Sequence, residues 1–197
     1  IMAMLSKEYW EKRYEEGTTS WDVGTITLPL KEYCDQIENK QIRILIPGAG
    51  NGYEVDYLFA NGFTNIWVID YASAPLNAIA KRLPQFPKEH LLQINFFDFS
   101  PDTKFDLILE QTFFCALDPK LRSLYAERMH KLLNSKGKLA GLLFQFPLTE
   151  VGPPFGGSSG EYKALFEPFF TIKKLETAYN SILPRENKEL FFIFEKK

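Results

Sequence analysis

Short apolar runs alternate with longer amphipathic stretches from residue 41 onward. The apolar runs are rich in β-branched and aromatic residues, which predicts strands at 42–46, 65–69, 91–94, 105–109, 139–146, 170–175 and 190–195. Apolar positions at helical spacing predict helices at 53–60, 73–83 and 162–166, and a longer one that begins at Pro119, includes Leu133 and ends before Gly137. Strands that alternate with helices over short links indicate a parallel sheet with helices on both faces.

The last two predicted strands have no helix between them. A loop that contains Pro184 joins them, so we expect a closing hairpin in which one strand runs antiparallel to the others. Together with the five earlier strands, this hairpin predicts a doubly wound, mostly parallel sheet of seven strands. The expected fold class is therefore α/β, with a Rossmann-like core over residues 41–197.

The first forty residues have a different pattern. Two helical stretches, at 6–16 and 28–38, flank a segment that contains Gly17 and Gly24. A chain of 197 residues has the size of one domain. We therefore expect residues 1–40 to form a helical cap on the core, within a single domain.

Composition limits the partners and the location of the protein. Lys and Arg total 23 and Asp and Glu total 25, so the net charge of −2 argues against a broad basic surface for nucleic acid. No apolar stretch approaches the roughly 20 residues that span a bilayer. The two cysteines, Cys34 and Cys115, cannot form a disulfide framework, which fits a reducing cytoplasm. We expect a cytoplasmic monomer that binds small molecules and contacts neither nucleic acid nor membrane.

A glycine-rich loop follows the first predicted strand of the core. Gly48, Gly50 and Gly52 precede a helix, and glycines there let the backbone turn tightly and approach a ligand at the helix N-terminus. Asp70 stands 22 positions after Gly48, at the end of the second strand, where a carboxylate can accept both hydroxyls of a ribose. Each feature alone is also typical of an ordinary turn. Their combination predicts a site for a nucleoside-containing cofactor, which includes the neighbouring Tyr71.

The glycine spacing distinguishes between cofactors. Dinucleotide sites usually have G-x-G-x-x-G, whereas this chain has G-x-G-x-G, and its first core strand begins only after about forty residues. Both points favour S-adenosylmethionine, which has no pyrophosphate, over NAD. After the third strand, Asp98 could accept the adenine amino group and Phe99 could pack on the adenine ring. A simple Asp-Phe-Ser-Pro turn explains these two residues equally well.

Several stretches of the chain form a longer pattern. They are Trp-Glu-Lys-Arg-Tyr at 10–14, Trp-Asp-Val-Gly at 21–24, the glycine loop with Asp70, Gln-Thr-Phe-Phe-Cys-Ala-Leu at 111–117 and Val-Gly-Pro-Pro-Phe at 151–155. The pattern resembles the class I S-adenosylmethionine-dependent methyltransferases of the thiopurine S-methyltransferase-like family. Within that family it is most similar to the thiol and halide methyltransferases.

The resemblance implies roles for individual residues. In such enzymes an aromatic N-terminal segment closes over the cofactor, the glycine loop meets its methionine part, and the two residues after the fourth strand meet its amino-acid end. The residues implied to bind the cofactor are Trp10, Tyr14, Trp21, Gly48, Gly50, Gly52, Asp70, Tyr71, Asp98, Phe99, Glu110 and Gln111. Aromatic residues near the predicted carboxyl ends of strands are expected to line the pocket for the methyl acceptor, and we assign Phe114, Phe146 and Phe155 to it.

Two departures from the family pattern concern the methyl acceptor. The family commonly has Asp-Tyr where this chain has Glu110 and Gln111, and it often has Tyr where this chain has Phe155. Both changes remove a hydroxyl donor, which favours an apolar thiol over an anion such as halide or thiocyanate. A thiol needs little acid–base assistance, because its thiolate is intrinsically a strong nucleophile.

The sequence predicts neither a catalytic residue nor a metal site. His90, His130 and Cys115 are expected to be structural, and the cysteines and histidines lack zinc-ligand spacing. The expected function is methyl transfer from S-adenosylmethionine to a small soft nucleophile, foremost a thiol. Halide or thiocyanate methylation, an NAD-dependent oxidoreductase and a nucleoside-binding module without catalysis are the alternatives.

Overall fold

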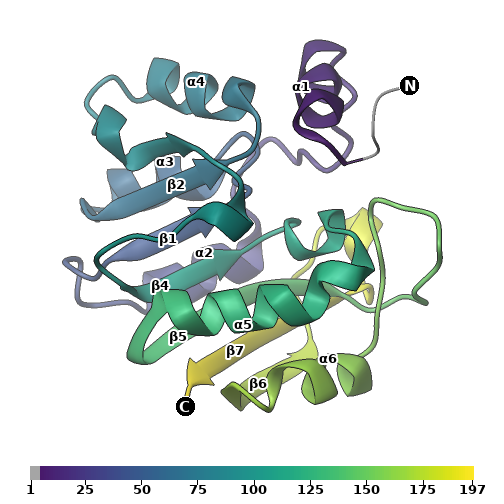
Figure 1. Ribbon diagram of the computed structural model, residues 1–197. Coiled ribbons are helices and arrows are strands. Elements are labelled where there is room, and N and C mark those ends of the chain that lie inside the picture. The colour runs from purple at the N-terminus through teal and green to yellow at the C-terminus, as the bar shows by residue number, and fades with distance from the viewer. Residues whose placement is uncertain (1–4) are drawn as a thin grey trace.

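A computed structural model describes residues 5–197, and residues 1–4 of the expected cap lie outside the described part. In this part, seven strands form one sheet in the order β3-β2-β1-β4-β5-β7-β6 (Figure 1). The strands are β1 (Ile44–Pro47), β2 (Ile66–Asp70), β3 (Leu91–Gln93), β4 (Phe105–Glu110), β5 (Leu133–Phe144), β6 (Phe170–Thr177) and β7 (Glu189–Lys196). Neighbouring strands from β1 to β5 pair in parallel, whereas β7 is antiparallel to both β5 and β6. The predicted α/β sheet with one antiparallel strand is confirmed.

Helices cover both faces of the sheet. They are α1 (Lys7–Glu15), α2 (Leu28–Asp35), α3 (Tyr53–Ala60), α4 (Ser73–Arg82), α5 (Arg122–Leu132) and α6 (Ser159–Phe166). The helices α5 and α6 pack on one face, and α2, α3 and α4 on the other. Among the helices of residues 5–197, none combines the length and apolar character that a membrane crossing requires.

Each central strand contributes side chains to two hydrophobic cores. In β1, Ile44 and Ile46 point to the core under α2, α3 and α4, whereas Leu45 points to the core under α5 and α6. This division follows from the two-residue period of a strand, in which successive side chains lie on opposite faces. A strand buried on both faces needs a continuous apolar run, which is what residues 44–46 provide.

The longest helix ends earlier than the sequence pattern predicts. Helix α5 ends at Leu132, and β5 begins at Leu133, without a loop between them. Leu133 is fully buried and pairs with Phe105 of β4. The prediction that Leu133 is helical is therefore wrong. Burial beside β4, at the start of β5, stabilises an extended backbone for the same apolar residue.

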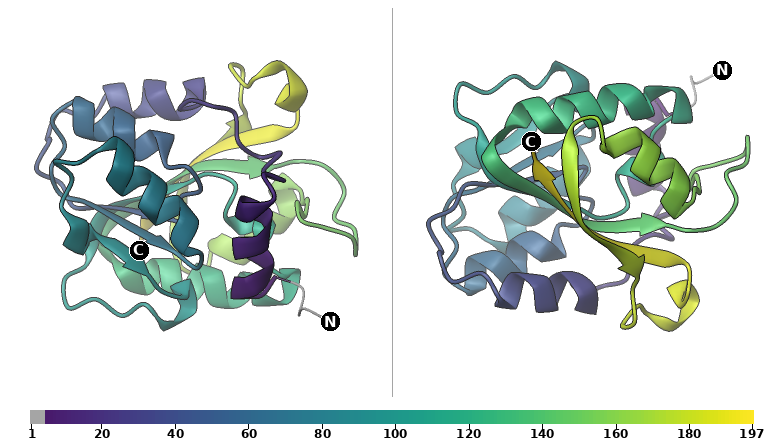
Figure 2. Two further views of the ribbon diagram at one scale, coloured as in Figure 1. Left: turned by 90° about the horizontal axis from the view of Figure 1, so that it is seen from above. Right: turned by 90° about the horizontal axis from the view of Figure 1, so that it is seen from below.

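Helix α1 stands away from both cores. It buries none of its side chains completely, and it lies beyond the carboxyl ends of the parallel strands (Figure 2). Among the helices and strands, its main neighbour is α4. Because ligands of open α/β sheets bind at the carboxyl edge, α1 lies where it can cover such a site.

The close approach of β4 and β5 depends on Gly141. A Cβ atom there would lie 1.9 Å from the carbonyl oxygen of Glu110, which is backbone and cannot swing aside. We expect Gly141→Ala to lower the free energy of unfolding by about 3 kcal/mol in urea titrations, since overpacking a buried site has costs of this order. The control is Gly160→Ala in α6, where the nearest group to the added Cβ would be the Ser158 hydroxyl at 4.0 Å; it should be neutral or slightly stabilising. Equal stability of the two variants would contradict this account of the strand pairing.

Candidate functional site

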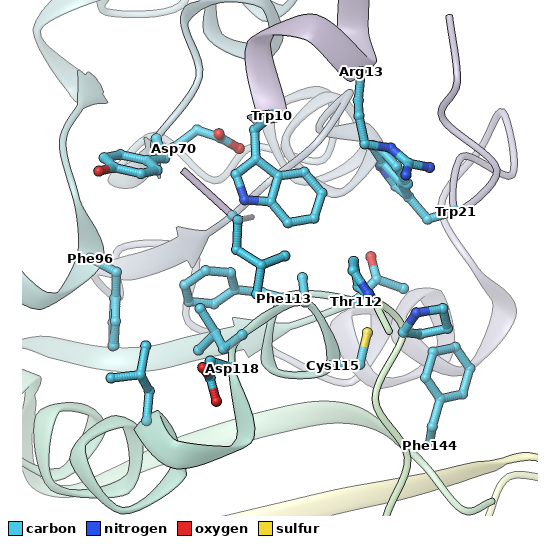
Figure 3. A pocket seen from close by; sticks show the side chains of 18 of the residues that line it. Trp10, Arg13, Trp21, Asp70, Phe96, Thr112, Phe113, Cys115, Asp118 and Phe144 are labelled. Carbon is cyan, nitrogen blue, oxygen red and sulfur yellow. The ribbon is translucent and has the colours of Figure 1, made fainter. Parts of the chain in front are cut away.

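A cavity of about 660 Å³ lies at the carboxyl edge of the sheet (Figure 3). Five of its lining residues follow or end successive strands: Gly48, Asp70, Ile94, Thr112 and Phe144. Residues of the N-terminal segment, among them Trp10, Tyr14 and Trp21, line its other side. The volume lies within the range of about 300–1,000 Å³ that is usual for small-molecule sites.

The cavity has two ends of different character. Figure 3 shows Asp70 and Phe96 at one end, Cys115 and Phe144 at the other, and Trp10 with Phe113 between them. We name the first the aspartate end; its lining residues are Asp70, Tyr71, Ile94, Asn95, Phe96 and Phe97. We name the second the arginine end; its lining residues are Cys115, Phe144, Phe146, Pro153, Pro154, Pro184, Arg185 and Lys188.

Asp70 is a buried carboxylate at the end of β2, with 8% of its surface exposed. Its Oδ1 accepts a hydrogen bond from the amide of Ala72 at 2.9 Å. Burial raises the pKa of Asp70 to about 6, and the nearby carboxylate of Glu11 adds to this rise, while backbone amides, including that of Gly50, oppose it. A carboxylate in this setting can bind hydroxyl donors strongly, because little water competes for it.

The glycine loop approaches both the cavity and the N-terminal segment. Gly48 has a φ of 58°, and a Cβ there would lie 2.3 Å from the ring of Phe113. A Cβ at Gly50 would lie 3.5 Å from Nε1 of Trp21 and 3.6 Å from the hydroxyl of Tyr14. The structure therefore brings Gly48, Gly50, Tyr14 and Trp21 together, although these residues come from two distant parts of the sequence. Gly52 instead packs against Ile79 of α4.

Three aromatic rings of the N-terminal segment pack on one another above the cavity. Trp21 makes edge-to-face contacts with Trp10 and Tyr14, at centroid distances of 5.8 and 5.7 Å. Burial raises the pKa of the Tyr14 hydroxyl, with Asp70 contributing to the rise, so the phenol stays protonated and can donate a hydrogen bond. The three rings shield the cavity from solvent on the side opposite the sheet.

Polar contacts attach this segment to the core. The Asp22 carboxylate accepts hydrogen bonds from the side chain of Asn51, in the glycine loop, and from the hydroxyl of Tyr53. The Glu11 carboxylate accepts a hydrogen bond of 2.7 Å from the amide of Ser73, at the start of α4. That amide would otherwise lack a helical partner, so Glu11 acts as a cap for α4 from a different helix.

Arg185 and Lys188 bring positive charge to the arginine end. Nη2 of Arg185 donates a hydrogen bond of 2.8 Å to the carbonyl oxygen of Trp21. The guanidinium carbon lies 5.7 Å from the ring centroid of Phe144. Neither cation is among the site residues expected from the sequence, because both lie in the loop between β6 and β7, outside every recognised motif. The only available signal was Pro184, which marked a loop without showing where it folds.

The proline-rich loop at this end is fixed at its base. The amide of Phe155 donates to the carbonyl oxygen of Cys115 at 2.8 Å, and Nη2 of Arg122 donates to the carbonyl of Gly156 at 2.6 Å. Pro153 and Pro154 thereby line the cavity, while the ring of Phe155 is buried beside Gly152. Of the three residues expected in the acceptor pocket, the structure places Phe146 on the cavity and Phe114 and Phe155 in the interior.

Glu110 and Gln111 point away from the cavity. Glu110 is fully buried, and its carboxylate accepts hydrogen bonds from the amides of Phe113 and Phe114, at 2.9 and 2.7 Å, and from the hydroxyl of Tyr125 at 2.7 Å. Burial raises its pKa to about 7, although these three donors oppose the rise. Gln111 accepts a hydrogen bond from the hydroxyl of Thr27 at 3.1 Å. Glu110 is thus completely buried and Gln111 partly buried, and neither lines the main cavity.

The segment after β3 presents other residues than those expected. Asp98 is exposed to solvent, and Phe99 is buried in the core beside Phe105. A short 3₁₀ turn over Phe96–Asp98 changes the direction of the side chains, and Asn95, Phe96 and Phe97 line the cavity instead. In the same way Phe113, and not its neighbour Phe114, forms the centre of the cavity wall.

The histidines and cysteines have distinct environments. His90 stacks on Trp67 at a centroid distance of 3.9 Å, and His130 packs beside Phe169 and Phe170. Cys115 lines the cavity, where burial raises the pKa of its thiol, so it stays protonated. Over residues 5–197, no group of three or more side chains is arranged to hold a metal ion.

Comparison with known proteins gives consistent matches. The family model for thiopurine S-methyltransferase matches residues 5–196. A probable thiol methyltransferase 2 of Arabidopsis thaliana is 34% identical over 171 residues, which cover 85% of this chain and 75% of that protein. A thiocyanate methyltransferase 1 of Brassica oleracea is 30% identical, with coverage of 91% and 81%.

Solved structures resemble the fold at low sequence identity. The 1,6-didemethyltoxoflavin-N1-methyltransferase of Burkholderia thailandensis, with S-adenosylhomocysteine bound, superposes with a TM-score of 0.80 at 16% identity and covers 97% of this chain and 87% of its own. A TehB-like S-adenosylmethionine-dependent methyltransferase of Corynebacterium glutamicum superposes with a TM-score of 0.68 at 15% identity, with coverage of 97% and 98%. These similarities establish the class of fold.

The raised pKa of Asp70 predicts a pH dependence of stability. In the unfolded chain the carboxyl titrates near its ordinary value of 3.8, but in the folded protein it titrates at about 6. Its protonated form therefore stabilises the fold below pH 4, and this contribution is lost as the pH rises through 6. Compared with Asp70→Asn, the free energy of unfolding of the wild-type protein should fall by up to about 3 kcal/mol as the pH rises through this range. Urea unfolding at several pH values measures the difference. Asp102→Asn, at an exposed carboxylate, serves as control; a parallel response of both variants would refute the assignment.

Proposed function

Because the chain belongs to the thiopurine S-methyltransferase family and is an S-adenosylmethionine-dependent methyltransferase, we propose that its methyl acceptor is a small thiol that reacts as the thiolate. One observation carries this proposal: a single cavity joins a buried carboxylate beside a glycine loop to an apolar end that contains a cation. The first end has the chemistry for a nucleoside, and the second has the chemistry for a soft anion.

The residues at the aspartate end fit S-adenosylmethionine. Asp70 is placed to accept the ribose hydroxyls, and Gly48, which lines the cavity, brings its backbone close to where the methionine part of the cofactor would lie. The rings of Trp10, Tyr14 and Trp21 would cover the bound molecule from the solvent side. For adenine, we propose the neighbours of Asp98 and Phe99 that line the cavity, Asn95, Phe96 and Phe97, since Asp98 and Phe99 themselves face away.

The arginine end suits a thiolate. Phe144, Phe146 and the prolines give it apolar walls, and Arg185 supplies a positive charge. A cation within about 4–6 Å lowers the pKa of an acid by roughly 1–3 units, so Arg185 would raise the fraction of a bound thiol that is ionised. Two tyrosine hydroxyls that are common in the family are missing at Gln111 and Phe155. Arg185 and Lys188 nevertheless provide hydrogen-bond donors at this end.

The reaction requires positioning more than acid–base chemistry. Bound S-adenosylmethionine supplies an electrophilic methyl group. The chain's own contribution is to hold the acceptor sulfur at the arginine end and to exclude water with the aromatic rings around it. Correct orientation of two reactants can contribute roughly 7–11 kcal/mol to lowering a barrier. The thiolate needs no base in the transfer step itself, since its proton has already been released.

Thiocyanate is a second candidate acceptor. The relative from Brassica oleracea is a thiocyanate methyltransferase, and Arg185 with Lys188 would attract that anion as well as a thiolate. The apolar walls favour an acceptor with a hydrocarbon part, which a thiol has and thiocyanate lacks.

The prediction of a cytoplasmic monomer stays a prediction; the two buried cysteines, neither of them in a disulfide, support the reducing location.

An acceptor panel tests the proposed function. We expect methyl transfer from labelled S-adenosylmethionine to small aromatic and alkyl thiols, with kcat/KM at least about tenfold higher than for thiocyanate or iodide. The reason is the burial of apolar surface, at about 0.8 kcal/mol per buried CH2 group. If kcat/KM for iodide or thiocyanate exceeds that for every thiol, the acceptor is an anion and not a thiol. If no compound in the panel is methylated, the proposed function is wrong.

The Asp70 assignment is tested by cofactor binding. We expect Asp70→Ala to weaken S-adenosylhomocysteine binding about tenfold or more in calorimetry, because charge-assisted hydrogen bonds to the ribose are lost. Asp102→Ala, at an exposed carboxylate, should bind as the wild type does. Unchanged affinity of Asp70→Ala would remove Asp70 from the cofactor site.

A further inference from the structure

Arg185 is paired with a second buried residue, Glu189. Nη1 of Arg185 lies 3.7 Å from Oε2 of Glu189, and the two residues are 9% and 2% exposed. Glu189 is the first residue of β7, and its position is fixed by pairing with Phe144 of β5. The carboxylate is therefore anchored on the sheet, whereas Arg185 belongs to the loop that precedes it.

Three elements hold the guanidinium. Nη2 is bonded to the Trp21 carbonyl of the N-terminal segment, the ring of Phe144 lies beside it, and Glu189 faces Nη1. The thiol of Cys115 and the ammonium of Lys188 also line this end and carry no negative charge, and the carboxylate next to Arg185 in sequence, Glu186, is exposed to solvent. Nη1 is buried and makes no hydrogen bond with the described residues.

Glu189 lies behind the cavity wall. It is not among the residues that line the main cavity, but it lines a much smaller one of about 10 Å³ together with Thr112, Cys115 and Phe144. These three residues also line the main cavity and so separate Glu189 from the space for the acceptor. Any effect of Glu189 on the reaction must consequently act through another residue.

A guanidinium this deeply buried needs a counter-charge. Removal of one partner leaves the other as an uncompensated buried charge, which is strongly unfavourable. Since Arg185 is in a loop, its side chain could turn outward to solvent and so avoid being an unpaired buried charge. The carboxylate of Glu189 thus supplies the counter-charge that, together with the Trp21 carbonyl and the Phe144 ring, keeps the guanidinium at the arginine end.

We propose that Glu189 is a positioning residue for methyl transfer, which holds the Arg185 guanidinium against the acceptor thiolate. The inference rests on the proposed function, because it assumes a thiolate at the arginine end. It assigns Glu189 no contact with substrate and no proton transfer. Its action is to maintain the positive charge that ionises and orients the acceptor.

Four variants test this role: Glu189→Gln, Arg185→Met, the double variant, and Glu186→Gln as control. Glu186 is an exposed carboxylate of the same loop, three positions before Glu189. For each protein, kcat and KM are measured with a small alkyl thiol between pH 6 and 10, and S-adenosylhomocysteine affinity is measured by calorimetry. Glu189→Asp, which keeps the charge but draws it back by one methylene group, provides a second variant if Glu189→Gln does not fold.

We expect Glu189→Gln and Arg185→Met to lower kcat/KM for the thiol about tenfold or more at pH 7. The acidic limb of the profile should move upward by about one pH unit, toward the pKa of the free thiol. The kcat/KM of the double variant should be no lower than that of the less active single variant, since each single substitution already removes the same positioned charge. Glu189→Asp should lose about threefold, Glu186→Gln should match the wild type, and S-adenosylhomocysteine affinity should change less than threefold throughout.

Three results would overturn the inference. Wild-type kinetics in Glu189→Gln would show that Arg185 needs no partner, and multiplied losses in the double variant would show that the two residues act separately. Cofactor affinity that falls as far as kcat/KM would mean that the pair acts on the N-terminal segment through Trp21 and not on the acceptor. Failure of the proposed function is distinguishable, because the wild-type protein itself would then not methylate the thiol.

Discussion

The carboxylate of Glu110 accepts three hydrogen bonds in the interior, two from the amides of Phe113 and Phe114 and one from Tyr125 of α5. The rest of the site depends on this cluster, because it fixes how the chain leaves β4. Thr112 adopts a positive φ of 55° there, which turns Phe113 against Gly48 and brings Cys115 to the arginine end. The absence of a side chain at Gly141 lets β5 approach this corner closely.

The N-terminal segment is attached by a different kind of interaction. Helix α1 buries no side chain completely, and polar contacts add to the packing of its aromatic rings on Trp21. Its position depends on hydrogen bonds that Asp22 and Glu11 accept from the core and on the hydrogen bond that Arg185 donates to the Trp21 carbonyl. Arg185 therefore contacts the N-terminal segment and also lines the arginine end of the cavity. Segments held by few buried contacts are the ones that open most easily, which suits a cover that must admit a cofactor.

Much of the fold could be predicted from local patterns, and part of the site could not. The strand runs, the glycine loop and Asp70 were visible because each is defined within a few residues. The side chains just beyond strand ends were harder to assign. Short 3₁₀ turns at Phe96–Asp98 and Phe114–Ala116 rotate successive residues by an amount that no apolar pattern records. The sequence pattern therefore indicated Phe114, whereas Phe113 lines the cavity. It likewise indicated Asp98 and Phe99, whereas their neighbours Asn95, Phe96 and Phe97 line the cavity.

The sequence by itself determined the alternation of strands and helices, the edge at which a ligand binds, and the family to which the motifs point. These features follow from residue periods and from the conformational freedom of glycine, which act over short distances along the chain. Only the tertiary structure decided which charges lie at the arginine end of the cavity. Arg185 reaches the cavity, and Glu189 lies behind its wall, because β7 inserts antiparallel between β5 and β6, so a loop from the end of the chain folds back beside Trp21. A contact across 164 positions leaves no local signal, since it depends on how the whole sheet closes.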